Sequence, residues 1–287
     1  MYLSLKAGLA YDDNKVKKMF EVKDPYFTDK VIGERTDRGL WGLSCIGMFR
    51  SYQQIDEYFQ KYNITNYLGL TKAQVQPGML IYEDIRGAKD DDGNYTAPDG
   101  VINSKDDAVQ ISKRSNNPYS ANANINFVWK DFAINATLQA QWGSYTLVPS
   151  SLRGEGFGNL QTTNINGMWS DMFVYEDYYD ANGNQLVWAN PDGWLPNIRY
   201  SSINSQASTF WRMSGTTVEL RNITLAWTLP KQWVRMAGLS SVRLNLTMQN
   251  AFSFYNPIPK GAWDEFAGNY GNYPACRKIT MGLNVTF

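Results

Sequence analysis

Segment 119–143 alternates apolar and polar side chains over two arms, which meet at Lys130-Asp131. One set of positions in each arm holds alanine, isoleucine, leucine and aromatic residues, and the other holds mostly serine, asparagine, threonine and glutamine. Successive side chains of a β-strand point to opposite faces, so the pattern predicts a hairpin with one apolar and one polar face. Each arm has about eleven residues, which is the span expected of a tilted strand that crosses a bilayer.

The aromatic residues of this hairpin are placed at its two ends. Trp129 and Phe132 flank the turn, Tyr119 and Trp142 lie at the far ends, and smaller apolar residues lie between them. Two aromatic levels on an apolar face are typical of a transmembrane β-barrel, whose outer face contacts lipid. The alternative is a soluble β-sandwich carbohydrate-binding module, whose core is expected to hold the bulky residues in the middle of each strand. The pattern therefore favours the barrel.

Similar alternation predicts five further strands, which makes seven in all, at residues 3–11, 39–49, 216–229, 242–248 and 277–287. Within 216–229 the apolar positions change parity at Arg221-Asn222, which indicates either a β-bulge or the point where the strand leaves the bilayer.

The predicted connections between these strands differ in length. Segments 50–118, 144–213 and 251–275 are long loops, with a helix expected at 51–62 and a short strand at 79–85. The turns near Lys130 and Lys231 are short, and we expect 12–38 to be a longer exception on their side. Long loops on one side and short turns on the other are typical of outer-membrane barrels.

The composition excludes several classes of protein. Lysine plus arginine (27) equals aspartate plus glutamate (27), and no basic stripe is present, so nucleic acid is not an expected partner. Histidine is absent, which removes the commonest general base and metal ligand. Cys45 and Cys276 fit no metal-binding spacing and are expected to be unpaired thiols. Mean hydropathy is −0.43 and no long apolar run occurs, so a transmembrane helix is not expected.

Seven strands are too few for the polar interior that these faces imply, and bacterial single-chain barrels have even strand numbers. The first and last strands would also keep open edges, which a bilayer does not tolerate. No signal peptide is visible before Tyr2. We therefore expect residues 1–287 to be part of a larger barrel whose N-terminal remainder is missing or is a separate chain.

Several motifs resemble those of SusC/RagA-type TonB-dependent outer-membrane transporters. Residues 77–85 (PGMLIYEDI) resemble the family segment P-G-D-I-x-Y-x-D-x. Residues 210–212 (FWR) and 218–230 (VELRNITLAWTLP) together resemble the signature F-V-R-L-K-N-I-T-L-G-Y-T-L-P. Residues 239–250 are similar to the family's next strand, and residues 273–274 (YP) and 282–287 (GLNVTF) to its terminus. The order and spacing hold from about Gly39 to the end.

The resemblance implies that residues 1–287 are the C-terminal part of a transmembrane antiparallel β-barrel of about 22 strands with long extracellular loops. It implies the outer membrane of a Gram-negative bacterium and the uptake of oligosaccharides or peptides, powered by TonB. It also implies a SusD-like surface lipoprotein that covers the barrel, and a plug domain N-terminal to Met1. No cofactor is implied, and the sequence does not distinguish glycan from peptide.

The predicted ligand-binding residues lie in the long loops, where aromatic rings can stack on sugars and carboxylates can accept hydrogen bonds from hydroxyl groups. They are Trp169, Asp177, Tyr178, Trp188 and Trp194. The alternative role of each ring is packing within the loops or against the lipoprotein. The predicted lumen-facing residues contact the plug or line the path, and are Asn122, Asn124, Asn126, Asn135, Gln139, Arg243 and Asn245.

Neither a metal site nor a catalytic site is expected. Residues 84–106 resemble a calcium loop of the family, with oxygen donors at Asp84, Asp99, Asn103 and Asp106. Arg86 stands where a ligand is required, so a solvated acidic loop is favoured over a metal site. The chain has no G-x-S-x-G motif and no phosphate-binding glycine loop. A surface glycosidase built on the acidic pairs 176–177 or 264–265 remains as a third alternative.

Overall fold

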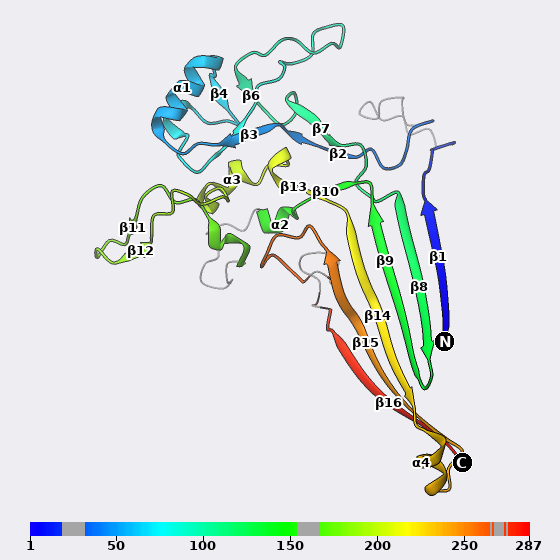
Figure 1. Ribbon diagram of the computed structural model, residues 1–287. Helices are drawn as coiled ribbons and strands as arrows, with labels where there is room; N and C mark the ends of the chain where they lie inside the picture. Colours follow the sequence, from blue (N-terminus) through cyan, green and yellow to red (C-terminus); the bar gives the residue numbers. More distant parts are fainter. Residues whose placement is uncertain (19–31, 154–166, 265, 267–272, 274) are drawn as a thin grey trace.

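The computed structural model describes residues 1–18, 32–153, 167–264, 266, 273 and 275–287. It consists of a sheet of six long strands, called the long sheet, with a loop layer at one end (Figure 1). The loop layer comprises the described residues of 12–118, 143–216 and 256–277. The strands of the long sheet are β1 (Tyr2–Tyr11), β8 (Tyr119–Trp129), β9 (Phe132–Trp142), β14 (Thr217–Thr228), β15 (Ser241–Tyr255) and β16 (Lys278–Thr286).

The long sheet is antiparallel throughout, in the order β1-β8-β9-β14-β15-β16. β8 and β9 pair from Tyr119 opposite Trp142 to Trp129 opposite Phe132, so their turn is Lys130-Asp131. Lys130 has a φ of 52°, in the left-handed region that two-residue hairpin turns use. The predicted hairpin is confirmed, with its second strand ending at Trp142 rather than Gly143.

The predicted strand 39–49 is not part of the long sheet. It is divided into β2 (Leu40–Leu43), which pairs with β7 (Ala108–Ser112), and β3 (Cys45–Met48), which pairs with β5 (Leu80–Tyr82). Leu43 and Phe49 are fully buried, and a Cβ atom on Gly42 would lie 2.2 Å from the carbonyl oxygen of Ala207. The poor alternation of this segment reflects its close packing inside the loop layer. Over the described residues, the long sheet has six strands rather than seven.

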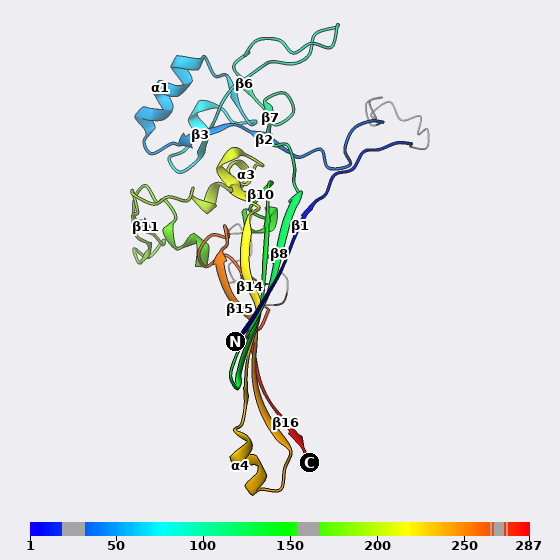
Figure 2. The ribbon, with the colours of Figure 1, turned by 45° about the vertical axis from the view of Figure 1, so that its right-hand side comes forward.

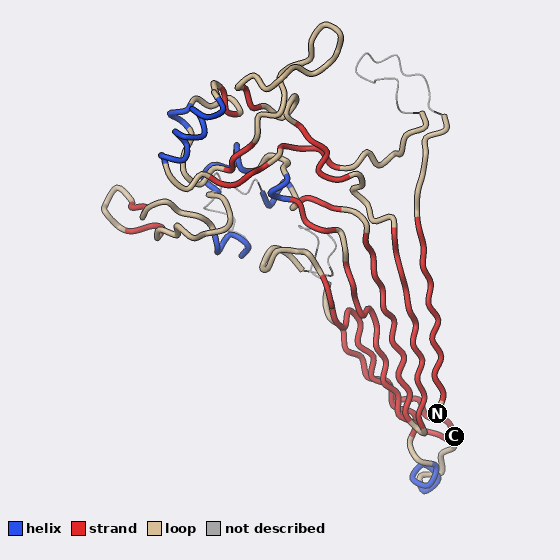
Figure 3. Tube along the Cα trace, turned by 45° about the horizontal axis from the view of Figure 1, so that its top comes forward, coloured by secondary structure: helices blue, strands red, loops and turns tan. Residues whose placement is uncertain are grey.

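All three long connections lie at one end of the long sheet, and both short turns lie at the other (Figure 3). β1 leads into one connection that runs from Asp12 to Pro118, whose ends are joined by a hydrogen bond from Asp12 N to Pro118 O (2.8 Å). The placement of 12–38 on the short-turn side was therefore wrong, because no strand of the long sheet separates 12–38 from 50–118. The second short turn holds helix α4 (Lys231–Met236).

A β-bulge explains the change of parity in β14. The pairing of β14 with β9 shifts between Leu220 and Asn222, so Arg221 is the additional residue opposite β9. The pairing with β15 shifts at the same point, where the additional residue lies on β15. The strand continues in register to Thr228 after the bulge. Of the two interpretations of the sequence, the bulge is confirmed.

The register places like side chains in rows across the long sheet. One row is apolar and contains Leu5, Ile125, Ala136, Ile223, Met248 and Ile279. The neighbouring row, on the opposite face, is polar and contains Ser4, Asn126, Asn135, Thr224, Thr247 and Thr280. The buried hydrophobic cluster of the molecule includes no residue of the six strands, and Met281 is 79% exposed. Among the described residues no second sheet packs on the apolar face, which removes the basis of the β-sandwich alternative.

Aromatic rings gather at both ends of the long sheet. At the turn end, Phe132 stacks on Trp227 (centroids 5.9 Å apart), and Trp233 of α4 contacts Trp227 edge-on (6.2 Å). At the loop end, Tyr119 lies between Tyr11 (5.1 Å) and Trp142 (5.8 Å). The two aromatic levels predicted from the hairpin thus extend to its neighbouring strands.

The loop layer has a hydrophobic core of its own, and most of it leans to one side of the long sheet (Figure 2). The predicted helix is α1 (Tyr52–Tyr62), whose N-cap Ser51 accepts a hydrogen bond from Gln54 N. Its residues Ile55, Tyr58 and Phe59 are buried against the core. Over the described residues, every helix is too short or too polar to cross a membrane.

The remaining elements of the loop layer are short. They are β4 (Asn66–Tyr67), β6 (Val101–Ile102), β10 (Tyr145–Leu147), β11 (Tyr178–Tyr179), β12 (Gln185–Val187), β13 (Arg212–Ser214), α2 (Ser150–Arg153) and α3 (Ser201–Asn204). The 3₁₀ turns among the described residues are at Lys72–Gln74, Gly167–Asp171, Ile198–Tyr200 and Thr209–Trp211.

Candidate functional site

The polar face of the long sheet carries all seven residues predicted to line the lumen. Asn122 lies opposite Gln139 and Asn126 opposite Asn135, while Asn245 and Arg243 continue the polar face on β15. The hydroxyl of Thr137 donates a hydrogen bond to Asn124 Oδ1 (2.9 Å), and the Thr224 and Thr247 hydroxyls are 3.0 Å apart. The face therefore presents a continuous array of amide and hydroxyl groups, which can exchange hydrogen bonds with water or with a polar ligand.

The loop layer covers this polar face where it reaches the loops. Glu219, opposite Gln139, is only 5% exposed, and its Oε2 lies 2.7 Å from Nε of Arg221 in the bulge. The guanidinium of Arg221 lies over the ring of Phe266 in the third loop (6.0 Å). The bulge therefore changes the direction of the Arg221 side chain, so that its guanidinium pairs with the buried carboxylate of Glu219 at the end of the polar face.

Trp169, the first of the predicted ligand-binding residues, is 4% exposed. Its ring meets Trp211 edge-on (5.9 Å) inside the hydrophobic core. The structure thus places Trp169 in the packing of the loop layer, which is the alternative role weighed for each ring.

Asp177 and Tyr178 lie together at the β11–β12 hairpin. Asp177 Oδ1 accepts a hydrogen bond from Ala189 N (2.6 Å), which closes the hairpin. Tyr178 carries the guanidinium of Arg199 over its ring (5.1 Å). Tyr178 and Arg199 line a cavity of about 510 Å³ with the apolar side chains Met172, Val174 and Leu186. Tyr178 is thus at a cavity wall, whereas Asp177 positions the backbone of the hairpin.

Trp188 and Trp194 are the exposed members of the predicted set. Trp188 is 74% exposed and lines neither of the two loop cavities described here. Trp194 is 58% exposed and stacks on Phe210 (5.1 Å, 26° between planes), at the wall of a second cavity of about 510 Å³. The structure therefore divides the five predicted residues between the core, two cavities and the open surface, and their role in binding stays a prediction.

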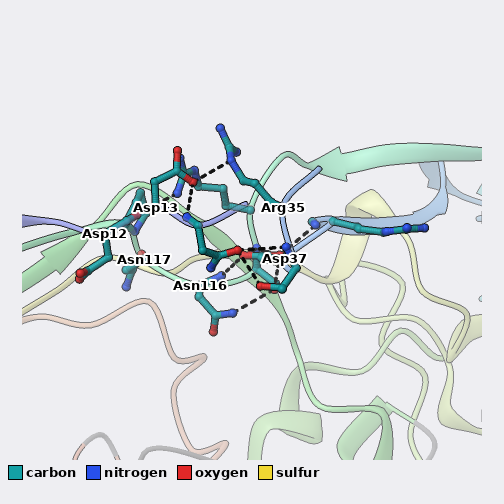
Figure 4. A pocket seen from close by; sticks show the side chains of 13 residues that line it. Asp12, Asp13, Arg35, Asp37, Asn116 and Asn117 are labelled. Carbon is teal, nitrogen blue, oxygen red and sulfur yellow. Dashed lines mark hydrogen bonds and ion pairs between the residues drawn. The ribbon is translucent and has the colours of Figure 1, made fainter. Parts of the chain in front are cut away.

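A polar cluster joins the loop layer to the ends of β1 and β8, and Figure 4 shows its charged side chains turned towards one another. Asp13 pairs with Arg35 (3.0 Å) and Arg114 (3.4 Å). Asp37 accepts hydrogen bonds from Gly39 N, Asn116 N and the backbone and hydroxyl of Ser115. Burial raises the pKa of Asp37, but these hydrogen bonds outweigh it and hold the pKa below its ordinary value. Both carboxylates therefore have partners, Asp13 in ion pairs and Asp37 in hydrogen bonds, and the cluster serves as a fastening of the loop layer.

The acidic loop predicted to lack a metal is organised around Asp107 and Arg86. Asp107 is fully buried and accepts hydrogen bonds from Ile85 N (2.8 Å), Arg86 N (3.2 Å) and Asn103 N (2.8 Å). The guanidinium of Arg86 donates to the carbonyl oxygens of Asp106 and Ala108 and lies over the Tyr95 ring (4.1 Å). The described residues contain no group of three acidic or cysteine side chains arranged to hold a metal ion.

The buried phenol and thiol groups of the loop layer lie in or against its hydrophobic core and stay uncharged there. Burial raises the pKa of the Cys45 thiol to about 11 and raises the pKa of Tyr67 and Tyr82 above the ordinary value. Tyr82 donates a hydrogen bond to Ile203 O (2.9 Å), and Tyr67 donates to Leu80 O. Cys45 and Cys276 are unpaired, as predicted. Of the acidic pair 264–265, Glu265 lies outside the described residues.

Reasoning from the sequence missed the charged and aromatic residues that share the second cavity with Trp194. These are Asp171, Phe210, Arg212 and Lys260. They come from three separate stretches of chain, and no periodic or spaced motif links them. The resemblance of residues 210–212 to a family signature marked that stretch but gave it no role.

Comparisons with known proteins agree with this fold. No family model matches the chain. TonB-dependent receptor P3 of Formosa agariphila is 25% identical over 293 residues, which covers 96% of this chain and 26% of the relative. The solved structure of the RagAB peptide transporter matches 99% of this chain and 27% of that one, with a TM-score of 0.58 at 15% identity.

A RagAB peptide importer structure in its closed-closed state matches equally, with a TM-score of 0.58 over 99% of this chain. The chain thus spans about a quarter of the length of the relatives it matches. These relatives are named as a receptor and as transporters, which supports the prediction that the chain is not an enzyme. The predicted resemblance to TonB-dependent transporters of the SusC/RagA type is confirmed, and it places the chain in the outer membrane of a Gram-negative bacterium.

Proposed function

We propose that residues 1–287 form the C-terminal part of a barrel of about 22 strands, in a transporter that imports oligosaccharides or peptides across the outer membrane. The observation that carries the proposal is the inverted polarity of the long sheet. Its apolar residues lie on a face on which no second sheet packs among the described residues, while its amides and hydroxyls share the other face. That arrangement suits lipid outside and a polar passage inside.

The two edge strands of the long sheet indicate that the barrel contains further strands. β1 and β16 each pair with one neighbour only among the described strands. Unpaired backbone groups cost several kcal/mol each in hydrocarbon, on the order of the cost of burying an amide without a hydrogen bond. We therefore assign the closure of the barrel, and a plug inside it, to a part of the transporter that precedes this segment.

The proposed partners follow from the asymmetry of the fold. A SusD-like lipoprotein would cover the side that carries the loop layer, where Trp188 and Leu186 expose apolar surface. TonB would act from the opposite side, through the part of the transporter that precedes this segment. The name of the RagAB peptide transporter supports an importer that takes peptides, and the aromatic loop surface equally supports oligosaccharides.

Uptake by cells that carry the full-length transporter tests this proposal. We expect labelled oligosaccharides or peptides to accumulate only when TonB is present, with the amount of transporter in the membrane unchanged. The matched control is a strain that lacks the transporter but retains TonB. Accumulation that continues without TonB would indicate a passive pore and contradict the proposal.

A further inference from the structure

The cavity beside Trp194 lies where the loop layer meets the long sheet. Its wall includes Ser214 of β13, Tyr255 at the end of β15 and Lys260 of the third loop. Its volume is about 510 Å³, within the range of small-molecule sites. A ligand that moves between the loops and the long sheet would meet this cavity, so its chemistry bears on what the transporter selects.

An aromatic platform forms one wall of the cavity. Trp194 stacks on Phe210, and Phe210 in turn meets the buried ring of Trp211 edge-on (4.9 Å, 86°). Trp211 is fixed by a hydrogen bond from its Nε1 to Asn204 O (2.6 Å). The platform is therefore held from below by the core, while Trp194 remains 58% exposed. A flat apolar surface of this kind accepts the C–H face of a sugar ring.

Three charged side chains line the same cavity and are unpaired within the described structure. Asp171 uses only its backbone carbonyl, which accepts from Leu195 N (3.0 Å). The Arg212 guanidinium lies over the Tyr145 ring (4.8 Å) and makes no hydrogen bond or ion pair among the described residues. Lys260 likewise has no ion pair with any described residue. The polar cluster at Asp13 and Asp37 differs, because there Asp13 has ion-pair partners and Asp37 has hydrogen-bond partners.

We propose that this cavity binds a sugar residue that carries an acidic substituent, such as a carboxylate or a sulfate. The inference rests on the proposed import function and names its ligand class. Trp194 supports the ring, Arg212 and Lys260 pair with the acidic group, and Asp171 accepts hydrogen bonds from hydroxyl groups. Two cations against one carboxylate favour an anionic ligand over a neutral one, and the flat platform favours a sugar over a peptide.

Titration of the purified full-length transporter with defined oligosaccharides tests this inference. The probes are a panel of oligosaccharides bearing uronate or sulfate groups, the same compounds with carboxylates reduced or sulfates removed, and acidic tripeptides. We expect at least one acidic oligosaccharide to bind about tenfold more tightly than its neutral counterpart, because charge-assisted hydrogen bonds are strong and tenfold equals about 1.4 kcal/mol.

Three variants assign that binding to the cavity. We expect Trp194→Ala and the double change Arg212→Gln with Lys260→Gln each to weaken acidic oligosaccharide binding about tenfold. The double change should also remove the preference over the neutral counterpart. Trp41→Ala is the matched control that leaves both unchanged, because this exposed ring of β2 does not line the cavity. Equal binding of neutral and acidic probes, tighter binding of the tripeptides, or no effect of the double change would overturn the inference. None of these binding results decides whether uptake requires TonB, so the proposed function is tested separately.

Discussion

The long sheet and the loop layer place their apolar side chains in opposite ways. In the long sheet, large apolar residues such as Leu9 and Met281 are among the most exposed of the molecule. In the loop layer, Tyr67, Tyr82 and Trp211 are almost completely buried in a common core. One chain therefore follows two rules for apolar groups, and the difference is explained if water surrounds the loop layer while lipid surrounds the long sheet.

The same comparison extends to polar groups. Polar side chains of the long sheet lie on one face and hydrogen-bond across strands, as Thr137 does with Asn124 (2.9 Å). Buried polar groups of the loop layer are instead tied to backbone, as Asn204 is to Leu80 N (2.9 Å) and Asn197 O (2.8 Å). The loop layer is thus organised as the interior of a water-soluble protein, whereas the long sheet is organised as a boundary between two media.

The largest expected effect breaks the core of the loop layer. Trp211→Ala should reduce the free energy of loop-layer opening by about 3–5 kcal/mol, because it removes a large buried ring and leaves a cavity. Amide hydrogen exchange of the full-length transporter measures this opening region by region. Trp188→Ala is the matched control, since that ring is exposed and should change the free energy by less than about 0.5 kcal/mol. Similar costs for the two changes would argue against a water-soluble core in the loop layer.

A charge on the apolar face of the long sheet should have the next largest effect. Leu138 lies midway between the aromatic levels of β9, so Leu138→Arg should destabilise the folded barrel by about 2–4 kcal/mol if that face contacts lipid. Gln139→Arg on the polar face places the same charge opposite Glu219 and should cost little. Urea titration of the full-length transporter folded into lipid vesicles measures both. If the two substitutions destabilised the barrel equally, the conclusion that only the apolar face contacts lipid would be wrong.

The sequence determines these two regions to different degrees. Strands of the long sheet were predictable because successive side chains face two different media. The type of a residue such as Ile125 therefore indicates which face it lies on, without knowledge of the remaining fold. Segment 39–49 was misassigned because it is divided between two short sheets, so its burial does not alternate: the neighbours Met48 and Phe49 are both buried, whereas Trp41 and Ile46 are more than half exposed. Its partners β5 and β7 lie tens of residues away, and no local pattern specifies such pairing.

The same reason limits prediction of the candidate site. Residue type drew attention to Trp194, because exposed loop tryptophans are uncommon, but type alone did not separate it from the buried Trp169. Asp171, Arg212 and Lys260 line one cavity only through the packing of three separate stretches from two loops. Their unpaired charges are a property of the fold, so they were not accessible to reasoning from sequence.

The smallest expected effect concerns the fastening between the two regions. The pKa of Asp37 is lowered in the folded state, because hydrogen bonds from Ser115, Gly39 and Asn116 favour its carboxylate more than burial disfavours it. A lowered folded pKa means that this stabilisation is fully present above the unfolded value of about 4 and is lost as pH falls through the folded pKa. We therefore expect the amides of Ser115 and Asn116 to lose protection from hydrogen exchange at acid pH, after correction for intrinsic rates.

Two variants connect this pH dependence to Asp37 itself. Asp37→Asn should weaken the protection of these amides at neutral pH and flatten its dependence on pH, because the amide does not titrate in this range and has a single oxygen acceptor. Asp12→Asn, in the same cluster, should leave the profile unchanged, since the Asp12 contacts there use backbone atoms. If the loop layer loosened as a whole in acid, rather than at this junction alone, the distinction between an independently stable loop layer and its fastening to the long sheet would not hold.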